Sequence, residues 1–277
     1  MTAYRPSPRP TFDGPALITY ADVTRHIWGD PDAGEVADWI YASTERVHAL
    51  VFGLAPGAWF RHSPEFRTIF GADELLYVLR GTMVIANPET GEVLRVPQGG
   101  TAFFRADTWH HVHAHGNEEL RVLELYAPPP ATGSSGAYAR TKPYLERADW
   151  CYGDDSLIGN LLGAEPARRT LCEPPITWRR SLNVLEGLYC STEHLTAGVL
   201  ELNPGEASQS HSHAGDEIVY ALEGVLHVRA FGEQGISVFE LNPHDAAYIP
   251  HGIAHEYRSY GTAPVRAVFG VAPAYLP

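Results

Sequence analysis

Two parts of this chain are copies of each other. Four short segments occur twice in the same order: 41–45 and 189–193, 54–57 and 202–205, 73–77 and 216–220, and 127–128 and 272–273. The first pair reads Tyr-Ala-Ser-Thr-Glu and Tyr-Cys-Ser-Thr-Glu. Matches that keep their order while their spacing changes slightly indicate duplicated domains with small changes in loop length. We therefore expect two similar domains in tandem.

Short apolar runs bounded by glycine dominate each copy. In the second copy they cover residues 217–222 and 224–230, and their counterparts in the first copy are 75–79 and 83–86. Runs of this length predict β-strands, and many such strands at even spacing are typical of a jelly roll or barrel. The sequence therefore predicts an all-β fold with two tandem barrels.

The expected domain boundaries follow the repeat. Residues 1–130 form the N-terminal domain, 131–182 a linker and crossing segment, and 183–277 the C-terminal domain. The connection starts with a stretch rich in Pro, Gly and Ser at 128–136, which is typical of an extended, turn-rich linker.

The chain is acidic, with 20 Lys and Arg residues against 33 Asp and Glu residues and a formal net charge of −13. It shows no basic stripe, so nucleic acid and anionic membranes are poor partners. Its three cysteines have no Cys-x-x-Cys spacing, which argues against a disulfide framework. We find neither a leader peptide nor a long apolar run, and we expect a cytoplasmic protein with a small-molecule substrate.

The second copy contains four side chains of the types that ligate metals. His211 and His213 are two residues apart, and residues two apart on a strand face the same side. Glu217 opens the next apolar run, and His255 opens a later one. Three imidazoles and a carboxylate suit a divalent transition metal, with Fe(II) favoured and Mn, Ni, Co, Cu or Zn as alternatives. We predict one such ion per chain.

These residues carry a family resemblance. The spacing of Gly205, His211, His213, Glu217 and Gly224 is similar to the first signature motif of the cupin family at every position. The second cupin motif is matched by residues 250–255, although His244 and Ser259 replace its first glycine and its asparagine. The resemblance covers both repeats and implies a bicupin built of two jelly-roll β-barrels, with the metal in the C-terminal one. It also implies a homodimer.

The first copy has a degenerate metal motif. Thr68 and Phe70 stand where the second copy has His211 and His213, although Glu74 and His111 keep their ligand positions. These residues fit a rebuilt metal site, because His113 and His115 share a strand face with His111 and because His62 lies in a nearby insertion. We favour the two alternatives, a polar pocket without metal or a purely structural domain that packs against its partner.

Two residues near the metal motif are candidates for substrate contact. Gln209 is expected on the face of His211, and Tyr257 on the face of His255. Glu217 and Tyr257 are the expected catalytic residues, because each could move a proton. The cupin resemblance implies a metal-dependent enzyme, and we favour a dioxygenase-type oxidoreductase acting on a small oxygenated molecule. A redox-neutral isomerase, lyase or hydrolase and a non-catalytic binding protein are the alternatives.

Overall fold

The computed structural model describes residues 7–30, 34–61, 70–87, 90–106, 108–128, 171–174, 176–181, 183–233 and 235–276. Every regular element in these ranges is a β-strand, which confirms the predicted all-β fold. No helix within the described ranges is long and apolar enough to span a membrane.

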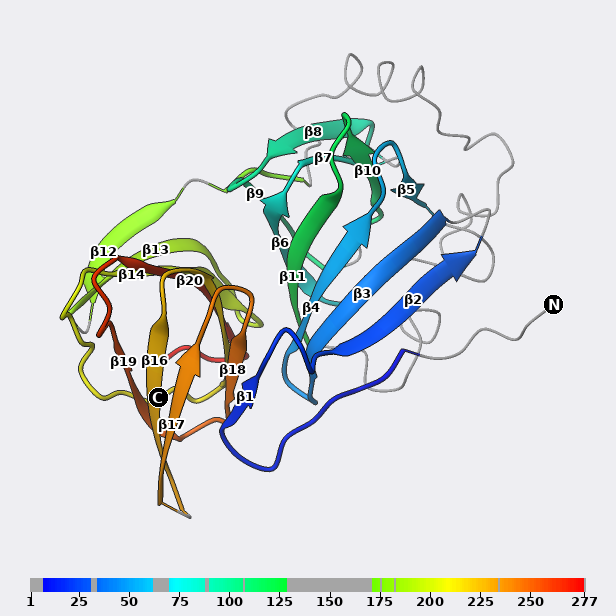
Figure 1. The fold of residues 1–277 in the computed structure, drawn as a ribbon. Helices are drawn as coiled ribbons and strands as arrows, with labels where there is room; N and C mark the ends of the chain where they lie inside the picture. The colour runs from blue at the N-terminus through cyan, green and yellow to red at the C-terminus, as the bar shows by residue number, and fades with distance from the viewer. Residues whose placement is uncertain are drawn as a thin grey trace.

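The N-terminal barrel combines a six-stranded and a four-stranded antiparallel sheet (Figure 1). Their strand orders are β2-β3-β4-β11-β6-β9 and β5-β10-β7-β8. The strands are β2 (Thr24–Asp30), β3 (Gly34–Ser43), β4 (His48–Leu54), β5 (Trp59–Phe60), β6 (Asp73–Arg80), β7 (Thr82–Asn87), β8 (Glu92–Pro97), β9 (Thr101–Phe104), β10 (His111–His115) and β11 (Leu120–Ala127).

The C-terminal barrel repeats this plan with a seven-stranded and a three-stranded sheet. Their strand orders are β1-β18-β15-β20-β14-β13-β12 and β17-β16-β19. The strands are β1 (Ala16–Ile18), β12 (Thr177–Ser181), β13 (Val184–Ser191), β14 (Thr196–Leu202), β15 (Asp216–Glu223), β16 (Leu226–Gly232), β17 (Gly235–Leu241), β18 (Ala246–Ile249), β19 (Ala254–Arg258) and β20 (Val265–Ala272).

Two edge strands of the large C-terminal sheet come from outside residues 183–277. β1, which belongs to the predicted N-terminal domain, pairs with β18 and sets Ala16 opposite Tyr248. β12, which belongs to the predicted crossing segment, pairs with β13 at the other edge. The sheet therefore draws strands from all three predicted segments of the chain, and its first strand ties the two barrels together.

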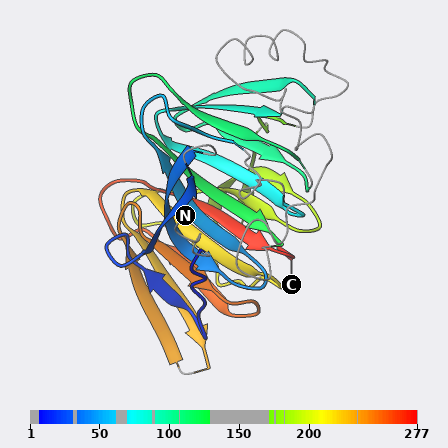
Figure 2. The same ribbon diagram turned by 90° about the vertical axis from the view of Figure 1, so that its right-hand side faces the viewer.

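The two large sheets pack against each other, and Figure 2 shows their strands lying together at the centre of the molecule. Because neighbouring residues on a strand face opposite sides, each sheet fills its own barrel with one face and the interface with the other. On β11, Val122 belongs to the N-terminal barrel core, whereas Leu123 belongs to the interface core. On β15, Val219 belongs to the C-terminal barrel core, whereas Ile218 belongs to the interface core. The interface is thus a third hydrophobic core.

Candidate metal centre

The predicted imidazoles come from two segments that pair at one point. His211 lies opposite His255 in an isolated β-bridge. The amide of His211 donates to the carbonyl of His255 over 2.9 Å, and the amide of His255 donates back to His211 over 2.7 Å. Because His255 belongs to β19, this pairing anchors the first histidine to the small C-terminal sheet.

The expected regular strand through His211 and His213 is not present. Beyond the single bridge at His211, residues 208–214 belong to no strand, because the chain leaves the sheet here to turn into β15. The carbonyl of His213 instead accepts a hydrogen bond of 2.7 Å from the amide of Gly252. The strand prediction was therefore wrong, yet the two imidazoles still lie together, with ring centroids 5.1 Å apart.

Each of the three imidazoles is oriented by a backbone carbonyl. The pairs of Nδ1 and carbonyl oxygen are His211 with Gln209 at 2.9 Å, His213 with Tyr275 at 2.6 Å, and His255 with Ile253 at 3.0 Å. Because a carbonyl oxygen can only accept, each neutral ring carries its proton on Nδ1. Each Nε2 then keeps a free lone pair, which is the arrangement that metal-binding histidines require.

The three rings converge on one point. One potential ligand atom from each of His211, His213 and His255 lies within 4.8 Å of the other two. His213 and His255 are buried, whereas His211 is partly exposed and marks the side from which a small molecule could approach. Burial, followed by the nearby His255, lowers the pKa of His211 to about 4, so the ring is neutral at pH 7. This triad could hold a divalent metal.

The carboxylate of Glu217 lies beside the triad. Its Oε2 is 2.9 Å from Nε2 of His255 and 3.5 Å from Nε2 of His213. Both Glu217 Oε2 and His255 Nε2 are buried without hydrogen-bond geometry to any described group, as expected of atoms directed at a shared ion. Burial raises the pKa of Glu217, but the attraction of His255 and His213 in their protonated forms outweighs burial, and the pKa falls to about 2. The group is therefore an ionised acceptor.

The predicted catalytic residue Tyr257 lies next to this cluster. Its ring centroid is 5.3 Å from that of His255 and 5.6 Å from that of His211, and its hydroxyl is buried without a hydrogen bond in the described region. Burial and the negative charge of Glu217 raise the pKa of Tyr257 well above its ordinary value. The phenol therefore keeps its proton and is a donor rather than a base.

The side chain of Gln209 is exposed, and its contribution to the triad comes from its backbone carbonyl, which orients His211. Its predicted contact with substrate stays a prediction. Sequence reasoning missed Tyr275, whose carbonyl orients His213 and whose ring centroid lies 4.5 Å from that of His213. A backbone acceptor leaves no trace in residue type, so no motif could have identified it.

A tight turn brings Glu217 to the triad. The amide of Gly215 donates to the carbonyl of Ala274 over 2.8 Å, and a Cβ at position 215 would lie only 2.4 Å from the carbonyl oxygen of Ala272. Only glycine therefore fits this approach without a shift of the backbone. The next residue, Asp216, is buried and accepts hydrogen bonds from the Tyr248 hydroxyl at 2.8 Å and the His251 amide at 3.0 Å.

The first barrel differs at the equivalent place. Phe70, which aligns with His213, stacks on Tyr126 with ring centroids 5.4 Å apart. The second changed position, Thr68, and the insertion residue His62 lie outside the described residues. An aromatic ring therefore occupies the position where the second barrel has an imidazole.

Among the described residues, the rebuilt site considered for the first barrel is not assembled. Glu74 and His111 are buried, but His113 stacks on Trp59 at a centroid distance of 6.0 Å and His115 is exposed. In the part of the chain that the structure describes, the C-terminal triad is the one group of three or more His, Cys, Asp or Glu residues with metal-ligand spacing. This agrees with the prediction of a single metal site in the second barrel.

Comparisons with known proteins match this architecture. A family model described as Cupin domain matches residues 54–126 and again residues 198–271. Among solved structures, a mutant of Bacillus subtilis oxalate decarboxylase has a TM-score of 0.64 at 12% identity, covering 98% of this chain and 80% of that one. A formate complex of Lactobacillus farciminis oxalate decarboxylase also has a TM-score of 0.64, at 15% identity, covering 98% of this chain and 89% of that one.

A further structure of Bacillus subtilis oxalate decarboxylase comes from work on the Mn(II) centres of that enzyme. It has a TM-score of 0.63 at 14% identity, covering 98% of this chain and 80% of that one. At these identities the likeness shows the fold. A comparison with curated protein sequences finds no match. The family match falls once on each copy of the internal repeat, so it covers both barrels.

Proposed function

Because this chain belongs to the cupin family and carries a histidine triad in its second barrel, we propose that it is a metal-dependent enzyme acting on a small oxygenated molecule. We propose further that the reaction is oxygen-dependent cleavage of the dioxygenase type. Two ions are candidates: Fe(II), which suits this chemistry, and Mn(II), which one structural neighbour contains.

One observation carries the proposal: three buried or half-buried imidazoles present Nε2 lone pairs to the same point, with an ionised carboxylate beside them. Packing alone does not require this arrangement, since buried polar atoms normally find hydrogen-bond partners. The triad and Glu217 together would supply four ligands. A metal bound there would supply Lewis acidity and, if redox-active, electron transfer to a chelated substrate.

The residues around the triad have separate tasks in this proposal. His211 is on the accessible side, so a substrate oxygen would enter next to it. Tyr257 keeps its phenolic proton and donates a hydrogen bond from its hydroxyl to a substrate oxygen or to Glu217. Glu217 Oε2 accepts a proton from the substrate or remains a ligand of the metal. The buried cluster around them excludes bulk water.

The experiment measures oxygen uptake and carbon dioxide release. Protein loaded anaerobically with Fe(II) or Mn(II) is supplied with oxalate, keto acids, catechols, enols or flavonols. We expect one substrate class to be turned over with oxygen consumption, and we expect Glu217→Gln to reduce kcat by about 100-fold or more. The matched histidine control is His115→Ala, which removes an exposed imidazole of the N-terminal barrel.

Two outcomes would contradict the proposal. Equal turnover with Zn(II) and without oxygen uptake would favour the redox-neutral isomerase, lyase or hydrolase. Tight binding of a substrate without turnover under any metal would favour the non-catalytic binding protein.

A further inference from the structure

The N-terminal barrel contains a cavity of about 100 Å³ on the inner face of its large sheet. It is lined by Ser7, Pro8, Arg9, Trp28, Val36, Asp38, Ile40, Ser43, His48, Leu50, Phe52, Phe60, Phe70, His110, Glu124 and Tyr126. By comparison with cavities that hold benzene, this volume takes on the order of five non-hydrogen atoms. The second barrel differs at a key position, where buried Phe269 stands in place of Glu124 in the repeat.

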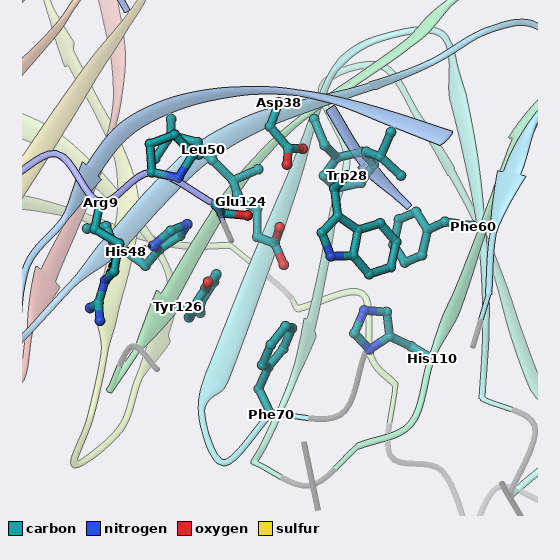
Figure 3. A pocket seen from close by; sticks show the side chains of 16 residues that line it. Arg9, Trp28, Asp38, His48, Leu50, Phe60, Phe70, His110, Glu124 and Tyr126 are labelled. Atoms are coloured by element: carbon teal, nitrogen blue, oxygen red, sulfur yellow. Dashed lines mark hydrogen bonds between the residues drawn. The ribbon is translucent and has the colours of Figure 1, made fainter. Parts of the chain in front are cut away.

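Two carboxyl groups enter this cavity from neighbouring regions of the sheet. Figure 3 shows Asp38 of β3 and Glu124 of β11 pointing into the space between Trp28 on one side and Tyr126 on the other. A third acid, Glu74 of β6, lies opposite Tyr126 in the strand register and is fully buried. Burial raises the pKa of each of these acids, so the potential at this point becomes strongly negative when they ionise.

Among the described lining residues, no fixed positive charge balances these acids. Arg9 is the one lysine or arginine among the lining residues, its Nε donates to the hydroxyl of Ser43 over 3.1 Å, and its guanidinium points away from the two carboxyl groups (Figure 3). Burial lowers the pKa of His48 to about 3 and that of His110 to about 4, so both imidazoles are neutral. The cavity therefore favours a cationic occupant.

Aromatic rings lie on both sides of the carboxyl groups. Trp28 and Phe60 meet edge to face at 5.9 Å, and Phe70 stacks on Tyr126 at 5.4 Å. Aromatic faces attract organic cations and accept their alkyl groups, whereas a hydrated metal ion prefers oxygen ligands throughout. Among the residues that the structure describes, the acids here also lack metal-ligand spacing. Both observations select an organic cation over a metal ion.

One buried polar atom of a lining residue and one of the neighbouring Glu74 have no hydrogen-bond partner in the described region. They are Nε2 of His48, whose Nδ1 pairs with the hydroxyl of Ser43 at 2.9 Å, and Oε2 of Glu74. His48 alternates with Leu50 and Phe52 on β4, all of which line the cavity, so its ring faces the interior. Buried atoms of this kind are normally satisfied, and a bound ligand with N–H groups would satisfy them.

We propose that this cavity is a binding site for a small primary or secondary ammonium ion, hydrogen-bonded to Asp38 and Glu124 between the two aromatic pairs. The site is separate from the C-terminal metal centre. Burial raises the pKa of Glu124 to about 7, and burial together with Glu124 raises that of Asp38 well above its ordinary range. An ammonium ion that binds below about pH 7 therefore displaces a proton from these carboxyl groups.

The experiment uses propylammonium chloride as the probe and the full chain at about pH 8, where Glu124 is ionised. We expect propylammonium to raise Tm, whereas 1-propanol and potassium chloride at equal concentration leave Tm unchanged. Calorimetry near pH 6.5, repeated in buffers of different ionisation enthalpy, should show proton release on binding. Tetramethylammonium, which has no N–H groups, should bind more weakly.

Variants test whether propylammonium binds in this cavity rather than elsewhere on the protein. Glu124→Gln and, independently, Asp38→Asn should weaken propylammonium binding by about tenfold or more, as expected for a charged hydrogen bond. The matched control Glu118→Gln changes an exposed acid of the same domain, and His213→Ala removes a metal ligand; both should bind like the wild type. Equal binding of 1-propanol, unchanged affinity in both acid variants, a stronger response to Mg²⁺ than to propylammonium, or no response to any ammonium ion would overturn the proposal.

Discussion

The hydroxyl of Thr44 in the N-terminal domain donates a hydrogen bond to the carboxylate of Asp216 in the C-terminal domain, 3.2 Å away. The repeat makes this contact reciprocal, because Thr192 donates to Asp73 over 2.6 Å. Each threonine comes from the repeated Ser-Thr-Glu segment, and each aspartate directly precedes the glutamate at the ligand position. The duplicated domains therefore anchor each other at the strand that carries this glutamate.

The Thr44 contact predicts a loss of stability on substitution. Thr44→Val removes one of the two hydroxyl donors to Oδ2 of the buried Asp216, the other being Tyr248, and hydrogen bonds to charged groups contribute roughly 1.5–3 kcal/mol. We expect the free energy of unfolding in urea to fall by about 2 kcal/mol. Thr19→Val is the matched control, because Thr19 makes the same kind of bond to Asp22 at the surface. Equal losses in the two variants would contradict the anchoring role of Thr44.

Gly215 is predicted to be essential for the position of Glu217. In Gly215→Ala the new Cβ would meet the backbone of Ala272, so the turn must shift and carry Glu217 with it. We expect metal affinity, measured by competition with a chelator, to fall by about tenfold or more, together with a loss of stability. The neighbouring substitution Ala214→Gly, at an exposed position, should retain full affinity. Retained affinity in Gly215→Ala would show that the approach to Ala272 does not position Glu217.

The pKa of Glu124 predicts a pH-dependent stability. Because burial raises this pKa from 4.5 to about 7, the folded state binds more protons than the unfolded state between these values, and stability falls as pH rises through 7. Relative to Glu124→Gln, the wild type should lose up to about 3 kcal/mol of unfolding free energy between about pH 4.5 and pH 8.

The low pKa values of His48 and His110 act in the opposite direction at acid pH, but they are shared by both proteins and cancel in this difference. Urea unfolding of both proteins across this pH range measures the difference in their unfolding free energies. A wild-type-minus-variant difference that stays constant with pH would show that Glu124 titrates normally, and Glu118→Gln supplies the control for an exposed glutamate.

The sequence was sufficient for the architecture and for the three histidines. The repeat made two domains evident, and glycine-bounded apolar runs located β6, β7, β15 and β16. His211 and His213 lie on one short segment, and His255 occupies its place in a second motif, so their proximity depends on few long-range contacts. The regular strand expected between His211 and His213 is absent, because the sequence does not show where the chain leaves the sheet.

The remaining features depend on tertiary pairing that one sequence does not reveal. The Tyr275 carbonyl orients His213 only because the end of the chain returns past the triad. Asp38 and Glu124 appear in the sequence as single acids within apolar strands, and only the strand register shows that both face the same cavity. A buried acid within an alternating apolar run is the signal that could have drawn attention to them.

Metal stoichiometry tests the central claim most directly. The full chain, purified and reconstituted with Fe(II) or Mn(II), is freed of excess metal and analysed by inductively coupled plasma mass spectrometry. The triad predicts about one equivalent per chain, which is lost in His213→Ala and retained in His115→Ala. Two equivalents per chain, or one equivalent that persists in His213→Ala, would contradict a single metal centre at His211, His213 and His255.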